Sequence, residues 1–224
     1  TYANIGSVEE LFNLKEQTYN LHLTASGLQN TSSRFLMDGA AYMDATEPAM
    51  AGAITIASAP ITDTVEMNVT LRRAAAKVVV QLIAGDKMEF SSDLPGSSEG
   101  YYMRNLPYET RVMDDGVLRQ QDMLETTNES MSNYYKWLRD ADNNIIGVEI
   151  TTYVYSHTWD TEDSFSHATN LLVDIPAYYT VTKDGVQTTT EHTNNYYQVP
   201  LSKEFKFKRN HYYEVTANVH APGA

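Results

Sequence analysis

Several stretches of the sequence hold side chains that could do chemistry, and a serine motif is the most suggestive of them. Residues 96–100 match the G-x-S-x-G pattern, in which a nucleophilic serine stands on a sharp turn between a strand and a helix. Pro95 precedes the motif, and Tyr101, Tyr102 and Met103 follow it. We therefore interpret residues 91–100, which are rich in turn formers, as a loop rather than a nucleophile elbow.

Two acidic stretches hold oxygen and imidazole ligands at short spacing. Residues 140–144 open like a calcium-binding loop, but Ile145 and Thr151 stand at the sixth and twelfth positions, which need a glycine and a bidentate glutamate. We interpret this stretch as a turn. Residues 157–167 combine histidines with carboxylates and could bind a transition metal or protonate at mild acidity. An exposed acidic loop explains the same composition without a ligand.

The rest of the sequence has few residue patterns typical of catalysis or ligand binding. None of the six histidines lies in an H-E-x-x-H arrangement, and the chain has no cysteine. Trp137 and Trp159 could stack on a sugar ring, although large aromatic side chains more often fill a core. We therefore predict that the protein is not an enzyme and has no catalytic, cofactor-binding or metal-binding residue, and we leave open whether residues 157–167 take up a metal.

The net charge of the chain disfavours some classes of binding partner. The sequence has 29 acidic and 16 basic residues, and the resulting net charge of -13 repels phosphate backbones and anionic lipid headgroups. We expect no nucleic-acid partner. No apolar run approaches the ~18 residues of a membrane-spanning helix, so we expect no transmembrane segment.

The elements that must position these stretches are strands. Tyrosine occurs 16 times and crowds the same segments as valine and threonine, which is typical of half-buried pleated surfaces. Residues 65–72 alternate apolar and polar side chains, which predicts a strand with one buried face. After a small-residue kink at 74–76, residues 77–83 are apolar on both faces, which predicts a central or covered strand.

Further strands follow from alternation, and helix is rare. The predicted strands comprise residues 19–25, 52–56, 146–156, 171–175, 204–208 and 212–219. The Asp184-Gly185 dipeptide predicts a tight hairpin between residues 179–182 and 186–189. A capping box of Ser7 and Glu10 predicts a short helix at residues 8–17. Residues 120–139 are interpreted as weakly helical or irregular.

Short strands with little helix indicate an all-β protein of the sandwich type. The chain of 224 residues is long enough for one large or two small domains. We predict two β-sandwich domains, residues 1–112 and residues 113–224, with the boundary near Val112.

Two strings in the sequence carry a resemblance to a known family. They are VTLRRAAAKVVV at residues 69–80 and FKRNHYYEV at residues 207–215, supported by residues 2–4, 101–107 and 152–155. In order and spacing they resemble the fimbrillin family, the type V pilus subunits of Bacteroidetes, across nearly the whole chain.

The resemblance implies a fold and an assembly route. It implies two transthyretin-like, Greek-key β-sandwich domains with a short N-terminal helix and long loops, and export to the cell surface and outer membrane as a lipoprotein. It also implies that a protease cuts after an arginine, which would make Thr1 a processed N-terminus. A strand then leaves the first domain, and a β-strand of a neighbouring copy or another pilus subunit fills the groove, pairing its unpaired N–H and C=O groups. The family's lipid-bearing cysteine is absent here.

We predict that apolar side chains of the two central segments line this acceptor groove. They are Val65, Met67, Val69, Leu71, Ala76, Val78, Val80 and Leu82. The predicted function is that of a structural subunit of a surface fimbrium that assembles by donor-strand addition. The alternative is a tip adhesin or a surface lipoprotein of related fold that binds host proteins or glycans.

Overall fold

The structure is a computed structural model, and it describes the chain in several segments. The described residues are 18–20, 37–38, 41–42, 68–69, 71–97, 99–107, 109–111, 118–119, 123–124, 129–130, 135–159 and 168–224. Every regular element among them is a β-strand, which confirms the all-β prediction. The predicted helix at residues 8–17 and the predicted strand at residues 52–56 lie outside the described residues.

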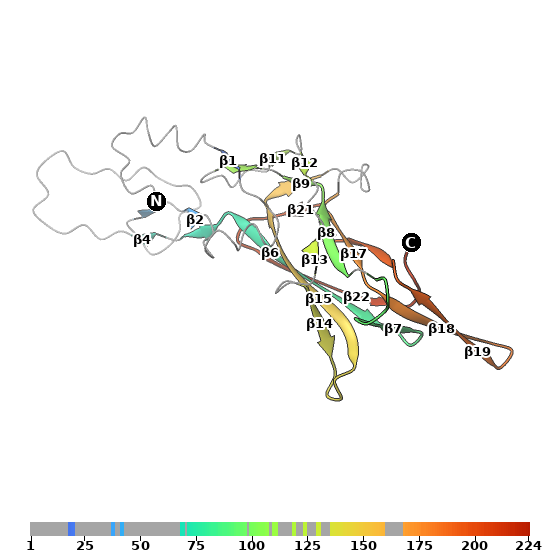
Figure 1. The fold of residues 1–224 in the computed structure, drawn as a ribbon. Helices are drawn as coiled ribbons and strands as arrows, with labels where there is room; N and C mark the ends of the chain where they lie inside the picture. Colours follow the sequence, from blue (N-terminus) through green and yellow to red (C-terminus); the bar gives the residue numbers. More distant parts are fainter. Residues whose placement is uncertain are drawn as a thin grey trace, which may run out of the picture.

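Three sheets dominate the described part of the chain (Figure 1). The first consists, in spatial order, of β14 (Tyr135–Arg139), β15 (Ile145–Tyr155), β6 (Ala75–Ala84) and β22 (Tyr212–Val219). The second consists of β13 (Glu129–Ser130), β8 (Gly100–Arg104), β17 (Asn170–Asp174) and β20 (Tyr196–Pro200). The third consists of β19 (Val186–His192), β18 (Ala177–Lys183) and β7 (Met88–Phe90).

Short ladders complete the fold. One joins β11 (Leu118–Arg119), β16 (His157–Thr158) and β21 (Lys206–Phe207). The others pair β1 (Thr18–Asn20) with β10 (Glu109–Arg111), β12 (Met123–Leu124) with β9 (Leu106–Pro107), β2 (Met37–Asp38) with β5 (Arg72–Arg73), and β3 (Ala41–Tyr42) with β4 (Asn68–Val69).

The core is formed where the sheets face each other. In β15, buried and partly exposed residues alternate along most of the strand, because successive side chains of a strand point to opposite faces. Val80 of β6 and Ile150 of β15 join Met103 of β8 and Leu171 of β17 in one buried cluster, and all four are at most 1% exposed. Full burial of an aliphatic side chain of this size stabilises the fold by about 1.5–3 kcal/mol. The described residues therefore form a β-sandwich.

The strands do not separate at the predicted domain boundary. From the first half, β6 pairs with β15 and β22 of the second half, β8 pairs with β17, and β7 pairs with β18. The buried cluster likewise draws on both halves. Residues on either side of Val112 thus share sheets and a core, because strand pairing joins segments that are distant in sequence.

Most of the predicted strands in the described residues are present. Their counterparts are β6, β15, β17 and β22, and the Asp184-Gly185 hairpin is present as β18 and β19. Both turn residues have positive φ angles, 52° and 79°, as a tight two-residue turn requires. The interpretation of residues 120–139 as helical or irregular was wrong at β14, because its pairing with β15 stabilises five residues whose own pattern is weak.

Candidate functional site

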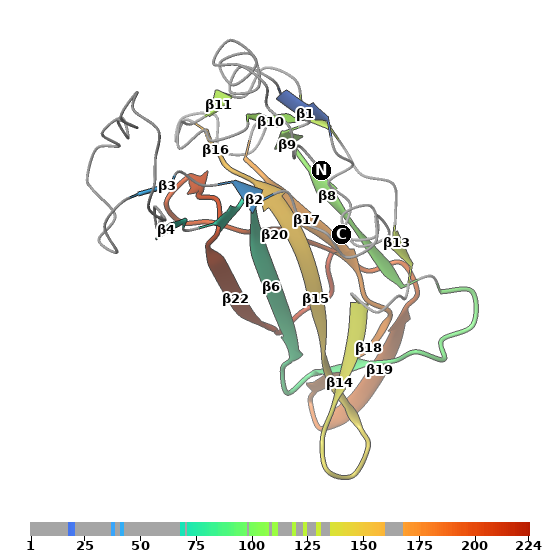
Figure 2. The same ribbon diagram turned by 90° about the vertical axis from the view of Figure 1, so that its left-hand side faces the viewer.

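The candidate site is the position along one edge of β6, at residues 77–84, that β22 occupies. We call this position the slot along β6. The two strands run parallel, with Tyr213 beside Val78, Val215 beside Val80 and Ala217 beside Leu82 (Figure 2). Along β22, half-buried residues alternate with exposed ones, and the half-buried ones pack against the core. The half-buried side chains of β22 therefore stand beside the row of apolar side chains on β6 and extend it along the core.

The structure gathers four of the predicted groove residues on one strand. Ala76, Val78, Val80 and Leu82 all lie on β6 and are at most 2% exposed. Both edges of β6 are paired, with β15 along residues 75–83 and with β22 along residues 77–84. β6 is therefore central, as predicted from its two apolar faces. The slot predicted to accept a strand from another copy holds the chain's own β22.

Two further predicted groove residues, Val69 and Leu71, are described and lie outside β6. Val69 ends β4 and pairs with Ala41 of β3. Leu71 follows outside any strand and is 52% exposed. Val65, Met67 and the predicted processed N-terminus Thr1 lie outside the described residues.

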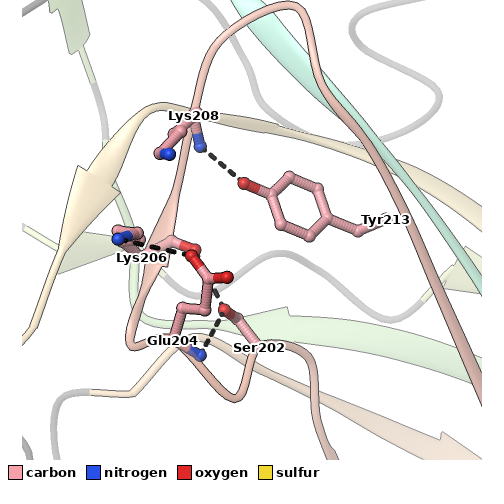
Figure 3. Close-up of polar contacts among 5 residues, drawn as sticks. All are labelled: Ser202, Glu204, Lys206, Lys208 and Tyr213. Atoms are coloured by element: carbon pink, nitrogen blue, oxygen red, sulfur yellow. Dashed lines mark hydrogen bonds and ion pairs between the residues drawn. The ribbon is translucent and has the colours of Figure 1, made fainter.

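The entry of β22 is anchored by polar contacts (Figure 3). The backbone N–H of Lys208 donates to the hydroxyl of Tyr213 at 2.9 Å. Two further bonds tie the preceding turn to β6: the Asn210 N–H donates to the Ala75 carbonyl at 3.1 Å, and the Lys77 N–H donates to the His211 carbonyl at 2.9 Å. The connection before β22 is thus held to the start of β6.

The loop beside this entry is closed by the other contacts in Figure 3. The Ser202 hydroxyl donates to the Lys206 carbonyl at 3.0 Å and accepts the N–H of Glu204 at 3.2 Å. The Lys206 ammonium lies 3.3 Å from the Glu204 carboxylate. This ion pair is exposed, and such pairs contribute little stability.

The exit of β22 leads into a tail that is tied to β20. The Gly223 N–H donates to the Asn195 side-chain oxygen at 2.7 Å, and Ala224 and Tyr196 exchange two backbone hydrogen bonds. A Cβ at Gly223 would clash with the Tyr196 carbonyl oxygen, so this close approach requires glycine. Sequence reasoning missed Asn195 and Gly223, because only the folded chain brings them together.

An aromatic cluster packs beneath the start of β22. The ring centroid of Phe207 lies 4.9 Å from that of Tyr213 and 5.6 Å from that of His157. Trp159 lies 5.2 Å from His157 and is only 7% exposed. Trp159 therefore fills the core and offers no open ring face to a sugar, while Trp137 is half-buried in a T-shaped contact with Tyr135.

His157 is fully buried in this cluster, and both of its ring nitrogens are engaged. Nδ1 lies 2.9 Å from the Tyr155 carbonyl, and Nε2 lies 2.5 Å from the Thr169 hydroxyl. Burial lowers the pKa of His157 to about 4, although the bond to Tyr155 opposes this shift. His157 is thus a neutral core residue near pH 7, and the rest of the predicted acidic loop, residues 160–167, lies outside the described residues.

The remaining sequence motifs are turns. The Asp140 carboxylate accepts hydrogen bonds from the side-chain amide and the backbone N–H of Asn144 and from the backbone N–H of Asp142, and these bonds, the side-chain one foremost, lower its pKa. The Ser97 hydroxyl donates to the Leu94 carbonyl, and β8 follows the motif in place of the helix that a nucleophile elbow needs. Ser98 lies outside the described residues. Among the residues that the structure describes, no group of three histidine or carboxylate side chains gathers to hold a metal.

Comparisons with known proteins give weak matches. No protein-family model matches the chain, and no curated protein sequence does. Two similar solved structures are candidate cell-adhesion proteins from Bacteroides fragilis (17% identity, TM-score 0.36) and Parabacteroides distasonis (15% identity, TM-score 0.42). Each match covers 70% of this chain but only 49% and 55% of the other chains, so this chain spans about half their length. At these scores the likeness carries no argument about function.

Within the described part of the chain, no helix is long and apolar enough to cross a membrane.

Proposed function

We propose that the chain is a non-catalytic structural subunit of a cell-surface fimbrium, exported as a lipoprotein precursor and joined to neighbouring subunits by an inserted β-strand. The observation that carries the proposal is the slot along β6, where the edge strand β22 pairs beside a row of buried apolar side chains. The sequence resemblance to fimbrillins supports the same assignment.

The slot fits strand addition because β22 satisfies two needs of β6 at once. Its eight residues pair with the backbone of Lys77–Ala84, and its inward side chains lie beside Val78, Val80 and Leu82. Without a strand in this slot, β6 would present unpaired N–H and C=O groups beside an apolar groove. A second subunit's strand with the same alternation would restore both, which is the physical basis of strand addition.

Exchange of β22 between copies can be tested with two single-cysteine variants, because the chain has no cysteine of its own. Val80 and Val215 are neighbours across the slot, and adjacent strands lie roughly 4.8 Å apart, within disulfide range. Val80→Cys and a tagged Val215→Cys should form mixed disulfide dimers when filaments assemble. Mixing Val80→Cys with Thr216→Cys is the matched control, since Thr216 pairs with Gln81 and its side chain is exposed.

Electron microscopy and unheated gels of the native protein give the second measurement. A fimbrial subunit should form filaments or ladders of oligomers. A protein that stays monomeric under all conditions would overturn the subunit role and favour the alternative, a tip adhesin or surface binding module. Filaments without mixed disulfides would retain the role but reject the β22 slot as the joint.

A further inference from the structure

The hairpin of β18 and β19 leaves a long strand edge open. β18 pairs with β7 only through Ala177–Tyr179, so the rest of the hairpin extends beyond the end of β7 (Figure 1). All residues of β19 except His192 are exposed, and Val186 is 66% exposed. On its outer side, β19 pairs with no strand among the described residues.

The edge of β19 lacks the features that usually protect such strands from pairing with other chains. Protective features include lysine, proline, bulges and covering segments. β14 carries Lys136 and an irregularity after Leu138, and β20 ends at Pro200 and pairs at Tyr196 with the tail. β19, with the sequence VQTTTEH, has no lysine, proline or bulge, and its only carboxylate is Glu191.

We propose that β19 is a docking site for the β19 of a second copy of this chain, paired antiparallel about a two-fold axis at Thr189. This contact is independent of the slot along β6. It would join the two hairpins into one four-stranded sheet, in the order β18, β19, β19, β18.

The backbone fixes which residues can form the pairs. The two-residue turn makes Lys183 and Val186 a hydrogen-bonded pair, and in an antiparallel ladder such pairs alternate. Residues 186, 188, 190 and 192 therefore bond to β18. Gln187, Thr189 and Glu191 direct their N–H and C=O groups to the open edge. A partner strand centred on Thr189 would engage all three, with about six hydrogen bonds.

The side chains favour the same register. With Thr189 opposite Thr189, Gln187 meets Glu191 and Val186 meets His192, so no like charges face each other. A register centred on Glu191 would place the Glu191 carboxylates of the two copies opposite each other. A register centred on Gln187 would leave Glu191 without a residue of the partner's β19 opposite it. The Thr189 register therefore gives the longest overlap without repulsion, and opposed threonines are a favourable cross-strand pair.

A disulfide tests the two-fold axis directly. Cα atoms of a hydrogen-bonded antiparallel pair lie about 5.5 Å apart, within disulfide range. Thr189→Cys should therefore give a covalent dimer under mild oxidation at micromolar protein. Thr182→Cys is the control, because Thr182 is also exposed and on the same hairpin but lies on β18, one strand away from the open edge of β19. Equal cross-linking of both variants, or none with Thr189→Cys, would overturn the proposal.

Charge variants test the register by sedimentation equilibrium. Gln187→Glu places one carboxylate opposite each Glu191, at two places in the dimer, and should weaken dimerisation about tenfold, whereas Gln187→Lys should strengthen it. Thr182→Glu and Thr182→Lys carry the same charge changes away from the edge and should change the dimerisation constant less than twofold. A wild-type protein that is monomeric at every concentration, or variants that follow net charge alone, would reject β19 as a self-docking edge.

Discussion

Acidification should destabilise the fold through His157. In the folded protein, burial lowers the pKa of His157 to about 4, whereas the exposed imidazole of an unfolded chain titrates near 6.5. Between these pH values the unfolded state binds more protons than the folded state. The free energy of unfolding therefore falls as the pH falls through this window.

The size of the effect follows from the two pKa values. Each unit of difference is worth about 1.4 kcal/mol. Relative to pH 7, the loss from His157 alone should reach about 2 kcal/mol at pH 5 and about 3 kcal/mol at pH 4. Because the Trp159 and Phe207 rings pack against His157, its protonation should also loosen the anchor of Tyr213 at the start of β22.

Urea unfolding between pH 7 and pH 4 measures this effect, with His157→Gln as the reference. The variant retains a polar side chain but does not titrate, so carboxylates that protonate in the same range affect both proteins alike. Wild type should lose about 3 kcal/mol more than the variant over this range. Equal losses in the two proteins would show that His157 is not held neutral by burial.

Three further substitutions test the packing. Gly147→Ala should destabilise the protein by about 2 kcal/mol in urea unfolding, since its Cβ would lie 2.6 Å from the Leu82 carbonyl oxygen. Asn195→Ala should cost about 2 kcal/mol, because it leaves the buried Ile175 carbonyl without its donor, and hydrogen exchange should then show faster exchange at Gly223. Trp159→Ala should lower stability by about 3 kcal/mol and leave sugar-array binding unchanged, whereas lost sugar binding in a folded variant would contradict its role as a core residue.

Local patterns in the sequence were sufficient for the strands with the clearest patterns, such as β6, β15 and β22. The two apolar faces of residues 77–83 predicted a central strand, because only burial on both faces accommodates such a run, and β6 is central. The Asp184-Gly185 hairpin followed from the positive φ angles that its turn requires. The same reasoning excluded residues 140–144 as a calcium loop, and the structure has a turn there whose carboxylate is satisfied by backbone N–H groups.

Only the tertiary structure decided which strands are neighbours. Alternation gives the buried face of a strand but not its partner, so the sequence alone could not place β22 beside β6 or draw strands from both sides of Val112 into one sandwich. For the same reason we interpreted His157 as part of an exposed loop that could bind a metal, whereas the fold buries it against Phe207 and Trp159. Partners distant in sequence determine both strand order and burial, and these decide the candidate slot along β6.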